Sequence, residues 1–402
     1  MAAKPVLNVA LIGYAFMGRA HSNAYRQVGH FFPDSPYALR RKVLVGRTDA
    51  AVKKAAEELG WEETSTDADA VIKRPDIDII DIGTPNDSHY DLAMKAIKAG
   101  KIVLCEKPLA MTTKEARAMA ASAKKAGVPN LIWHNYRRAP AATTAAQLIA
   151  DGKIGEIRHV RAVYLQDWLI DDACPYTWRM NVKTCGSGAH GDLNAHLIDM
   201  TRFLTGLEFT EVCGMSETFI KTRKTPDGKG KGIVDVDDAF LFLAKLSNGA
   251  VASYEATRSA LGRKNYNRIE VNGTKGSLVW NFERMNELEF FDSTDEARVQ
   301  GFRTIMCMNG GAHAYAGNYW PDGHIIGYEH TFINTLADFL VSLKAKKEFR
   351  PNFADGVATE EVLDAAIDSV KKHKWVKVDQ SQPATGHVLK GAKKASGKNA
   401  GL

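Results

Sequence analysis

Three side chains that could move a proton stand at helical spacing in the segment GDLNAHLID, residues 191–199. Asp192, His196 and Asp199 occupy positions i, i+4 and i+7, which lie on one face of an α-helix. A neutral imidazole is a suitable general base at physiological pH, and we predict that role for His196. Asp192, one turn away, would orient the ring or hold a neighbouring hydroxyl, and Asp199 would support the pair indirectly.

Two other interpretations of this helix remain open. The two histidines and two aspartates of residues 190–199 could bind a metal. Two residues turn an α-helix by about 200°, however, so His190 would point away from Asp192, and we predict no metal site. His196 could instead be a core histidine whose ring nitrogens are satisfied by neighbours.

A second group that could take part in proton transfer follows an apolar run in VLCEKPLAMT, residues 103–112. The run predicts a buried strand, and Glu106 and Lys107 stand at its carboxyl end, where open α/β sheets bind ligands. The ammonium of Lys107 could hold a substrate hydroxyl and ease its deprotonation. Pro108 would fix the backbone beside it, through a cis or a trans peptide bond.

A glycine turn after the first predicted strand would position a cofactor against these groups. Gly13, Ala15 and Gly18 have the G-x-G-x-x-G spacing, with Ala15 in place of the middle glycine. Gly13 allows a tight turn, Gly18 lets the next helix pack closely, and a pyrophosphate would lie beside Ala15 at the helix N-terminus. We therefore predict a dinucleotide site; a purely structural turn is the alternative.

The end of the second predicted strand bears on which dinucleotide is bound. An acidic residue there would bind the ribose 2′-hydroxyl of NAD, but this chain has Gly46-Arg47-Thr48. Arg47 could pair with a 2′-phosphate or stack on adenine. The cofactor is therefore predicted to be NAD or NADP, with a slight preference for NADP. A surface arginine with neither role is the alternative. The complete set of predicted cofactor-binding residues is Gly13, Ala15, Phe16, Met17, Gly18, Arg47, Thr84, Pro85, Asn86, His89, Glu106, Lys107 and Asn135.

The first 135 residues alternate short apolar runs with helical patterns, which predicts a doubly wound parallel sheet. Strands are expected at 7–13, 41–47, 76–85, 101–108 and 130–137, with helices at 17–28, 49–60, 87–100 and 113–127.

After residue 140, longer runs alternate apolar and polar residues and are joined by Asn-Gly turns, as in an antiparallel sheet with one packed face. Helices at 189–206 and 327–346 interrupt them. We predict an α/β protein with a Rossmann domain at 1–135, an α+β domain at 136–378 and a disordered basic tail at 379–402.

Bulk composition excludes several other classes. The chain has 402 residues, of which 45% are hydrophobic and 25% charged, as in a soluble two-domain protein. Its apolar runs fall well short of the roughly 20 residues that cross a bilayer. The net charge of +6 is concentrated in the tail, and no face alternates aromatic and basic residues, so no nucleic acid is expected. The five cysteines are scattered, which suits a reducing, cytoplasmic location.

These motifs together resemble the Gfo/Idh/MocA oxidoreductase family. The resemblance rests on the glycine turn, TPNDSH at 84–89, CEKPLA at 105–110 and GDLNAHLID at 191–199. Segments such as NYRRAPA and EATRSALGRKNY make the glycoside-oxidising members most similar. The family implies a Rossmann domain followed by a large open antiparallel sheet, which usually forms homodimer or homotetramer contacts.

The resemblance also implies hydride transfer between nicotinamide and a ring carbon of a sugar, glycoside, anhydrosugar or cyclitol. Carried over by position, Lys107 and His196 form the proton-transfer pair, and Asp192 binds the substrate. Other aromatic and polar residues, among them Tyr266 and the segment 313–324, could lie on the substrate side. The predicted substrate-binding residues are Tyr136, Arg137, Gln166, Trp168, Trp178, Arg179, Asp192 and His196.

Two other functions remain open at this stage. A redox glycosidase of the same family would oxidise C3 transiently, eliminate the glycosidic bond and regenerate its cofactor. A non-catalytic dinucleotide sensor is the third candidate, and the intact set of Lys107, Asp192 and His196 argues against it.

Overall fold

The computed structural model describes residues 4–380, so nearly all of the predicted basic tail lies outside the described residues. The chain divides into two compact units, each assembled from several stretches. The first unit takes the chain up to Asn135, with Trp178–Gly186 and Tyr328–Glu361; the second takes Tyr136–Thr177, Ser187–Gly327 and the chain from Val362 onward.

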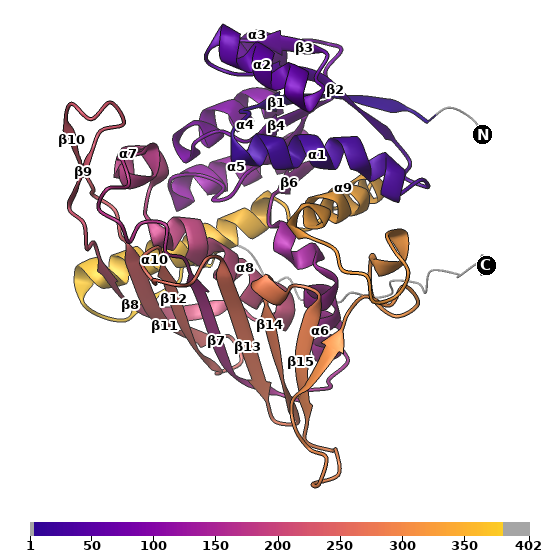
Figure 1. Ribbon diagram of the computed structural model, residues 1–402, viewed down its shortest axis with the longest axis vertical. Coiled ribbons are helices and arrows are strands. Elements are labelled where there is room, and N and C mark those ends of the chain that lie inside the picture. The colour runs from indigo at the N-terminus through magenta and orange to yellow at the C-terminus, as the bar shows by residue number, and fades with distance from the viewer. Residues whose placement is uncertain (1–3, 381–402) are drawn as a thin grey trace. The chain divides into compact units, whose positions relative to one another are not determined.

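A six-stranded parallel sheet in the order β3-β2-β1-β4-β5-β6 forms the centre of the first unit (Figure 1). Val9 to Leu11 of β1 and all residues of β4 are buried, as expected for strands with helices on both faces. The strand order reverses between β1 and β4, and ligands bind at such a reversal, beyond the carboxyl ends of the strands. The strands are β1 Val6–Ile12, β2 Ala38–Val45, β3 Glu63–Ser65, β4 Ile79–Ile82, β5 Ile102–Cys105 and β6 Asn130–Ile132.

The predicted doubly wound architecture is confirmed. The expected helices all form, and Gly60 and Gly127 end two of them in the left-handed conformation. Sequence analysis missed β3 and α3, which are short and lack an apolar run. The helices of this unit are α1 Phe16–Phe31, α2 Asp49–Leu59, α3 Ala68–Ile72, α4 His89–Lys98, α5 Thr113–Ala126, α7 Val182–Cys185 and α9 Tyr328–Lys344, with η1 Asn86–Ser88 and η3 Trp178–Met180.

Residues from late in the chain complete the first unit. Figure 1 shows α9 beside α1, and the ring of Tyr328 stacks on Phe16 with centroids 6.0 Å apart. Phe353 and Val357, at the start of α10 (Phe353–Lys372), are buried in the core formed by β1, β4 and β5. The backbone N–H of Phe353 donates to Oδ1 of Asn130 over 2.8 Å.

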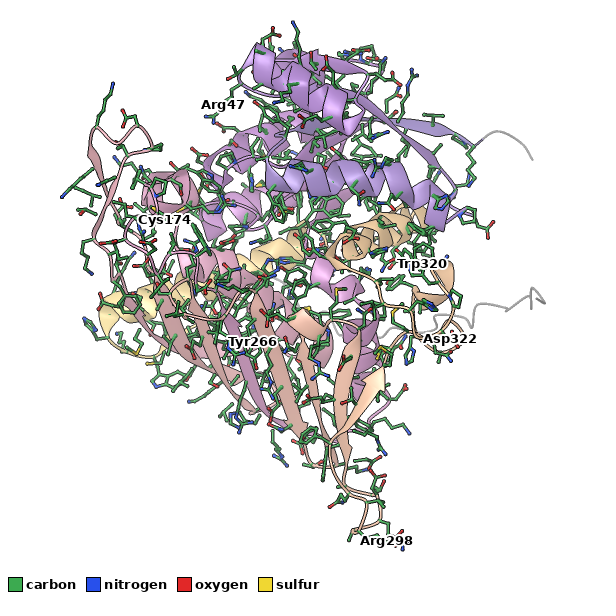
Figure 2. The ribbon with its side chains drawn as sticks, in the orientation of Figure 1. Arg47, Cys174, Tyr266, Arg298, Trp320 and Asp322 are labelled. Carbon is green, nitrogen blue, oxygen red and sulfur yellow. The ribbon has the colours of Figure 1, made fainter. Side chains whose placement is uncertain are left out.

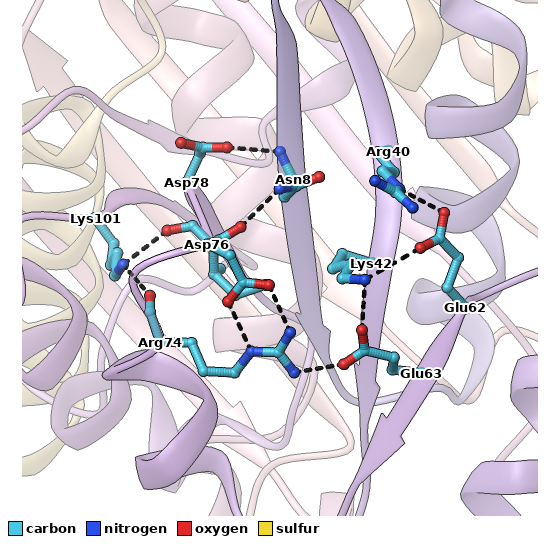
Figure 3. A network of polar contacts seen from close by, with 10 residues as sticks. Asn8, Arg40, Lys42, Glu62, Glu63, Arg74, Asp76, Asp78 and Lys101 are labelled. Atoms are coloured by element: carbon cyan, nitrogen blue, oxygen red, sulfur yellow. Dashed lines mark hydrogen bonds and ion pairs between the residues drawn. The ribbon is translucent and has the colours of Figure 1, made fainter.

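A network of charged side chains ties together the amino-terminal side of the same sheet (Figure 3). Arg74 pairs with Glu63 and Asp76, and the ammonium of Lys101 donates to the carbonyl of Ile77 over 2.7 Å. The backbone N–H of Asn8 donates to Asp78 over 2.7 Å. Each of these groups has a structural partner. Open α/β sheets bind ligands at the opposite, carboxyl end of the strands.

A nine-stranded sheet in the order β16-β15-β14-β13-β7-β12-β11-β8-β17 forms the centre of the second unit. Neighbouring strands are antiparallel except β7 and β12, which run parallel. The strands, including a separate β9–β10 hairpin, are β7 Ile157–Leu165, β8 Phe209–Glu217, β9 Thr222–Lys224, β10 Lys231–Ile233, β11 Ala239–Leu246, β12 Val251–Thr257, β13 Tyr266–Gly273, β14 Gly276–Asn281, β15 Glu287–Asp292, β16 Arg303–Met306 and β17 Val376–Lys377.

Helices α6 (Pro140–Ala150) and α8 (Ala195–Thr205) contact strands of this sheet. The predicted alternation is visible in β11, where Phe240, Phe242 and Ala244 are buried while Leu243 and Lys245 are exposed. The predicted fold class is therefore confirmed. The use of the exposed face for homodimer or homotetramer contacts stays a prediction. No helix within residues 4–380 is long and apolar enough to span a bilayer.

Candidate active site

The β1–α1 turn has the close packing that a dinucleotide turn requires. Gly13 has φ of +104°, and a Cβ there would lie 2.5 Å from the carbonyl oxygen of Gly83. A Cβ on Gly18 would meet the carbonyl oxygen of Gly13 at an equally impossible distance. Both positions therefore need glycine, and the first turn of α1 can pack directly against the sheet edge.

The N-terminus of α1 can receive an anion. Ala15 precedes the helix, and Phe16 and Met17 are its first residues. Ala15 has no side chain that could cap the helix, and the first turn carries no acidic residue, so the first amides and the positive end of the helix dipole can face a pyrophosphate. A hollow of about 910 Å³ adjoins this turn, lined by Tyr14, Ala15, Phe16, Tyr328, Glu329 and side chains of α1 and α2.

The turn gives a prediction about stability. Gly13→Ala is expected to lower the free energy of unfolding of the ligand-free protein by roughly 2 kcal/mol or more, since it adds left-handed strain and a clash with Gly83. Urea unfolding measures the change. Gly83→Ala is the matched control, because a Cβ there would have no neighbour closer than 3.8 Å. Equal stability of the two variants would contradict this account of the turn.

A positively charged side chain, that of Arg47, follows the end of β2. Arg47 is exposed (Figure 2), and Gly46 lies beneath the ring of Tyr14, where a Cβ would collide with it. Asp49, the nearest following acid, begins α2 and pairs with Lys53 over 2.8 Å. The described residues thus place no unpaired carboxylate directly after β2, as the sequence indicated.

The loops after β4 and β5 are tied together by His89. Its Nδ1 lies 2.9 Å from the carbonyl oxygen of Pro108, and its Nε2 lies 3.0 Å from that of Thr84. Burial lowers the pKa of His89, so the neutral ring donates to one of these carbonyls at a time. Both ring nitrogens face the backbone, so His89 positions the loop that carries Thr84, Pro85 and Asn86. A contact of His89 with a cofactor stays a prediction.

A fully buried polar network lies behind Lys107. Nδ1 of His21, on α1, is 2.9 Å from Asp81, and Nε2 is 3.0 Å from Glu106. The hydroxyl of Tyr25 donates to Asp81 over 2.7 Å, and the indole N–H of Trp133 donates to it over 3.0 Å. Burial by itself would lower the pKa of His21, but the charge of Asp81 and the hydrogen bonds to both carboxylates raise it to about 9. His21 is therefore an imidazolium that donates both ring protons.

Glu106 links this network to the backbone of Lys107. Its second oxygen accepts the N–H of Lys107 over 3.1 Å, and the Lys107–Pro108 peptide is cis. The side chain of Lys107 is half-buried. Sequence analysis missed His21 and Asp81, which no local motif brings together. Contacts of Glu106 and Lys107 with a cofactor stay predictions.

Three predicted residues from other segments also belong to the first unit. Arg179 lies over the ring of Trp178, 4.3 Å from its centroid, in a segment whose Cys185 carbonyl accepts from the amide of Asn86 over 2.9 Å. The amide of Asn135 donates to the hydroxyl of Thr331 over 2.6 Å and is buried. The roles of Trp178, Arg179 and Asn135 toward ligands stay predictions.

In the second unit, the predicted acid–base helix begins with a π-helical turn, His190–Asn194, that leads into α8. Such wide turns are frequent at functional sites. Asp192, in this turn, is half-buried and accepts from Arg258 over 2.8 Å. The ring of His196 stacks on Tyr136, with centroids 4.3 Å apart and planes 16° from parallel. Both of these contacts lie within the second unit.

Arg137 has a structural role. Its Nε lies 2.9 Å from one oxygen of Asp199 and its terminal nitrogen 2.5 Å from the other, and both side chains are almost completely buried. This two-point ion pair anchors α8 one turn beyond His196. Binding of substrate by Arg137 stays a prediction, as does the supporting role of Asp199 toward the site.

His190 is a core histidine. The amide of Asn194 lies 3.0 Å from Nδ1, so Nε2 carries the proton and donates to the carbonyl of Leu363 over 3.0 Å. The ring stacks on Phe240, and burial lowers its pKa. Within the part of the chain that the structure describes, no group of three or more His, Cys, Asp or Glu side chains could hold a metal.

A chain of hydrogen bonds connects the ring beside His196 to an exposed indole. The hydroxyls of Tyr136 and Tyr164 are 3.0 Å apart, and the chain continues through Asn265 and Gln166 to Trp168. Three predicted substrate residues, Tyr136, Gln166 and Trp168, therefore occur in one array. Sequence analysis missed Tyr164 and Asn265.

Other predicted aromatic residues lie elsewhere in the second unit. Tyr164 pairs with Asn267 across β7 and β13, so the next residue along β13, Tyr266, points to the opposite face of the sheet. The placement of Tyr266 on the substrate side stays a prediction. Trp320 and Asp322 belong to the 313–324 loop (Figure 2), in which Asp322 accepts from the amides of Asn309 and Gly310 and Trp320 is exposed.

A doubly wound sheet with a glycine turn at its first crossover, followed by a sheet unit with an Asp-x-x-x-His helix, is the architecture of a nicotinamide-dependent oxidoreductase. Residues 7–134 match the pattern of an oxidoreductase family with an NAD-binding Rossmann fold, and residues 142–279 match the Gfo/Idh/MocA C-terminal domain. Levoglucosan dehydrogenase from Pseudarthrobacter phenanthrenivorans is 41% identical over 387 residues, which are 93% of this chain and 98% of that protein. The chain belongs to the Gfo/Idh/MocA oxidoreductase family.

Solved structures agree with this assignment. A solved structure of levoglucosan dehydrogenase in complex with NADH and levoglucosan matches with a TM-score of 0.90 and 41% identity, over 93% of this chain and 100% of that one. An oxidoreductase domain protein from Kribbella flavida matches with a TM-score of 0.90 and 47% identity, over 93% of this chain and 99% of the other.

Proposed function

We propose that the protein is an NAD-dependent dehydrogenase that oxidises a secondary alcohol on the ring of a sugar, anhydrosugar, glycoside or cyclitol. The observation that carries the proposal is the likeness, along nearly the whole of both chains, to a dehydrogenase solved in complex with NADH and levoglucosan. The chain keeps the residue types that such a reaction needs: a lysine at a strand end of the nucleotide unit, and an aspartate and a histidine on one helix of the sheet unit.

In this proposal His196 takes the proton of the alcohol, and the ammonium of Lys107 stabilises the negative charge that develops on the same oxygen. Asp192, paired with Arg258, accepts a hydrogen bond from a neighbouring hydroxyl. Bound NAD supplies the hydride acceptor. The carbon loses a hydride and its oxygen loses a proton, so the alcohol becomes a ketone; the reverse sequence reduces the ketone.

We propose NAD as the preferred cofactor. The preference for NADP drawn from Arg47 finds no support in the comparisons, since the matching family is NAD-binding and the related solved structure contains NADH. Arg47 would then contact adenine or solvent.

Incubation with NAD or NADP and a panel of sugars, anhydrosugars, glycosides and cyclitols tests the function. We expect absorbance of reduced nicotinamide to appear with NAD and at least one member of the panel. Release of free sugar without net reduced cofactor would instead identify a redox glycosidase, which no described feature favours. Failure of every compound to react, in either direction and with either cofactor, would refute the proposal.

A further inference from the structure

In the hydrogen-bonded array beside His196, the donor and the acceptor of every bond can be assigned in only one way. The indole N–H of Trp168 lies 3.0 Å from Oε1 of Gln166, and Nε2 of Gln166 lies 2.8 Å from Oδ1 of Asn265. The hydroxyl of Tyr164 lies 2.7 Å from the same Oδ1 and 3.0 Å from the hydroxyl of Tyr136. The array therefore converges on Asn265 from two sides.

The indole fixes every donor in the array. Because an indole nitrogen can only donate, the atom of Gln166 that faces Trp168 is its carbonyl oxygen, and its amide must face Asn265. The atom of Asn265 that receives this amide is then its oxygen. Side-chain amides are otherwise ambiguous in orientation, and here the chemistry of one donor removes the ambiguity.

The same logic extends to the tyrosines. Oδ1 of Asn265 can only accept, so the hydroxyl of Tyr164 donates its single proton to this oxygen. The oxygen of Tyr164 must then accept from Tyr136. The ring of Tyr136, which stacks on His196, is thus held by a bond whose direction depends on Asn265.

The amide nitrogen of Asn265 is left facing away from the array. Among the residues that the structure describes, Nδ2 has no hydrogen-bond partner, while the backbone N–H of Asn265 donates to Glu283 over 2.9 Å. The residue is half-buried just before β13. Two N–H donors are therefore presented beside the predicted substrate residues Gln166 and Trp168, and sugar hydroxyl and ring oxygens are acceptors that match them.

We propose that Asn265 is a specificity-determining residue whose amide donates a hydrogen bond to an oxygen of the carbohydrate. The inference rests on the proposed dehydrogenase function and adds the residue that recognises the ring. Since the same side chain sets the hydrogen bond of Tyr136, the array also aligns the aromatic ring that packs on His196.

Two variants test the proposal in the complete chain with NAD. Asn265→Asp keeps an acceptor for Tyr164 and Gln166 but removes both N–H donors, and Asn265→Leu removes donor and acceptor together. Each is expected to raise KM for the best sugar roughly 5- to 100-fold, as loss of a partly buried hydrogen bond does, with a smaller change in kcat for Asn265→Asp. NAD affinity should not change, because the glycine turn belongs to the other unit.

Deoxy sugars provide the decisive comparison. One analogue, lacking the recognised oxygen, should lower kcat/KM of the wild-type protein by about the factor lost in Asn265→Asp, and it should cause no further loss in that variant. Asn272→Leu is the matched control, since this β13 residue donates to Glu270 and Ser277 on the sheet and should leave KM unchanged. If Asn265→Leu does not fold, Asn265→Asp carries the test.

The outcomes separate this proposal from the function on which it rests. Suppose that the wild-type protein is active. The role of Asn265 alone would then be overturned if Asn265→Asp had the wild-type KM, or if it raised KM equally for every deoxy analogue. A wild-type protein that oxidises no sugar would overturn the dehydrogenase function. Calorimetric titration of the same sugars into NADH-bound wild type and Asn265→Asp then decides whether Asn265 recognises them: equal affinities would contradict the proposal, and weaker binding to the variant would support it.

Discussion

Turnover is expected to fall by roughly 10²- to 10⁴-fold when His196 or Lys107 is replaced by alanine, since each change removes an oriented proton-transfer group. In His196→Ala the affinity for NAD should stay near that of the wild-type protein, because the turn formed by Gly13 and Gly18 and the predicted cofactor-binding residues are untouched. Steady-state kinetics on the best sugar and fluorescence titration with NADH measure the two effects separately.

Matched controls exist for both changes. His159, at the other end of β7 from Tyr164, and Lys114, exposed in the first turn of α5, can each be changed to alanine with turnover expected near the wild-type value. Full activity in His196→Ala or Lys107→Ala would remove that residue from the proposed mechanism, whatever the other variant did.

His21→Ala is expected to destabilise the first unit by roughly 3–5 kcal/mol, as removal of one partner from a buried ionic cluster does. Without the imidazolium, Asp81 and Glu106 would remain buried with no shared cation. Chemical denaturation monitored by tryptophan fluorescence measures the loss. His30→Ala, in the last turn of the same helix, is the control and should cost less than about 1 kcal/mol. Similar losses in both variants would contradict the role of His21.

The same cluster predicts how stability depends on pH. The pKa of His21 is raised from 6.5 to about 9, so the folded protein holds this proton more tightly than the unfolded chain. The resulting stabilisation, on the order of 3 kcal/mol, is complete below pH 6.5 and is lost as the pH rises toward 9. Wild-type protein should therefore lose stability across this window relative to His21→Ala. Parallel curves for the two proteins would exclude the contribution.

Local patterns accounted for most of the first unit. The structural roles of Gly13 and Gly18 could be predicted from their spacing, because all the residues that form a glycine turn lie within six positions of the sequence. The pairing of His21 with Asp81 and Glu106 could not, since it depends on three elements that meet only in the folded sheet. Strand β3 has three half-buried residues and no hydrophobic period that would reveal it.

The second unit shows where pattern analysis fails for a site. Helical spacing indicated one face for Asp192, His196 and Asp199, but it could not reveal the π-helical turn that precedes α8 or the ion pair of Asp199 with Arg137. Arg258 and Asn265 join the candidate residues only through tertiary contacts between distant segments. Such contacts depend on strand register and on the path of the loops, neither of which the sequence states.

Helix α9 and Phe353 belong to the first unit but come late in the sequence, and this order affects how the protein folds during synthesis. A ribosome that has synthesised only the glycine turn and the six parallel strands has not yet supplied the side chains that close their core. The nucleotide-binding half must wait, with apolar surface uncovered, until almost the entire sheet half has been translated. The nucleotide-binding half is therefore not a portable module that could be cut out at residue 135 and expressed by itself.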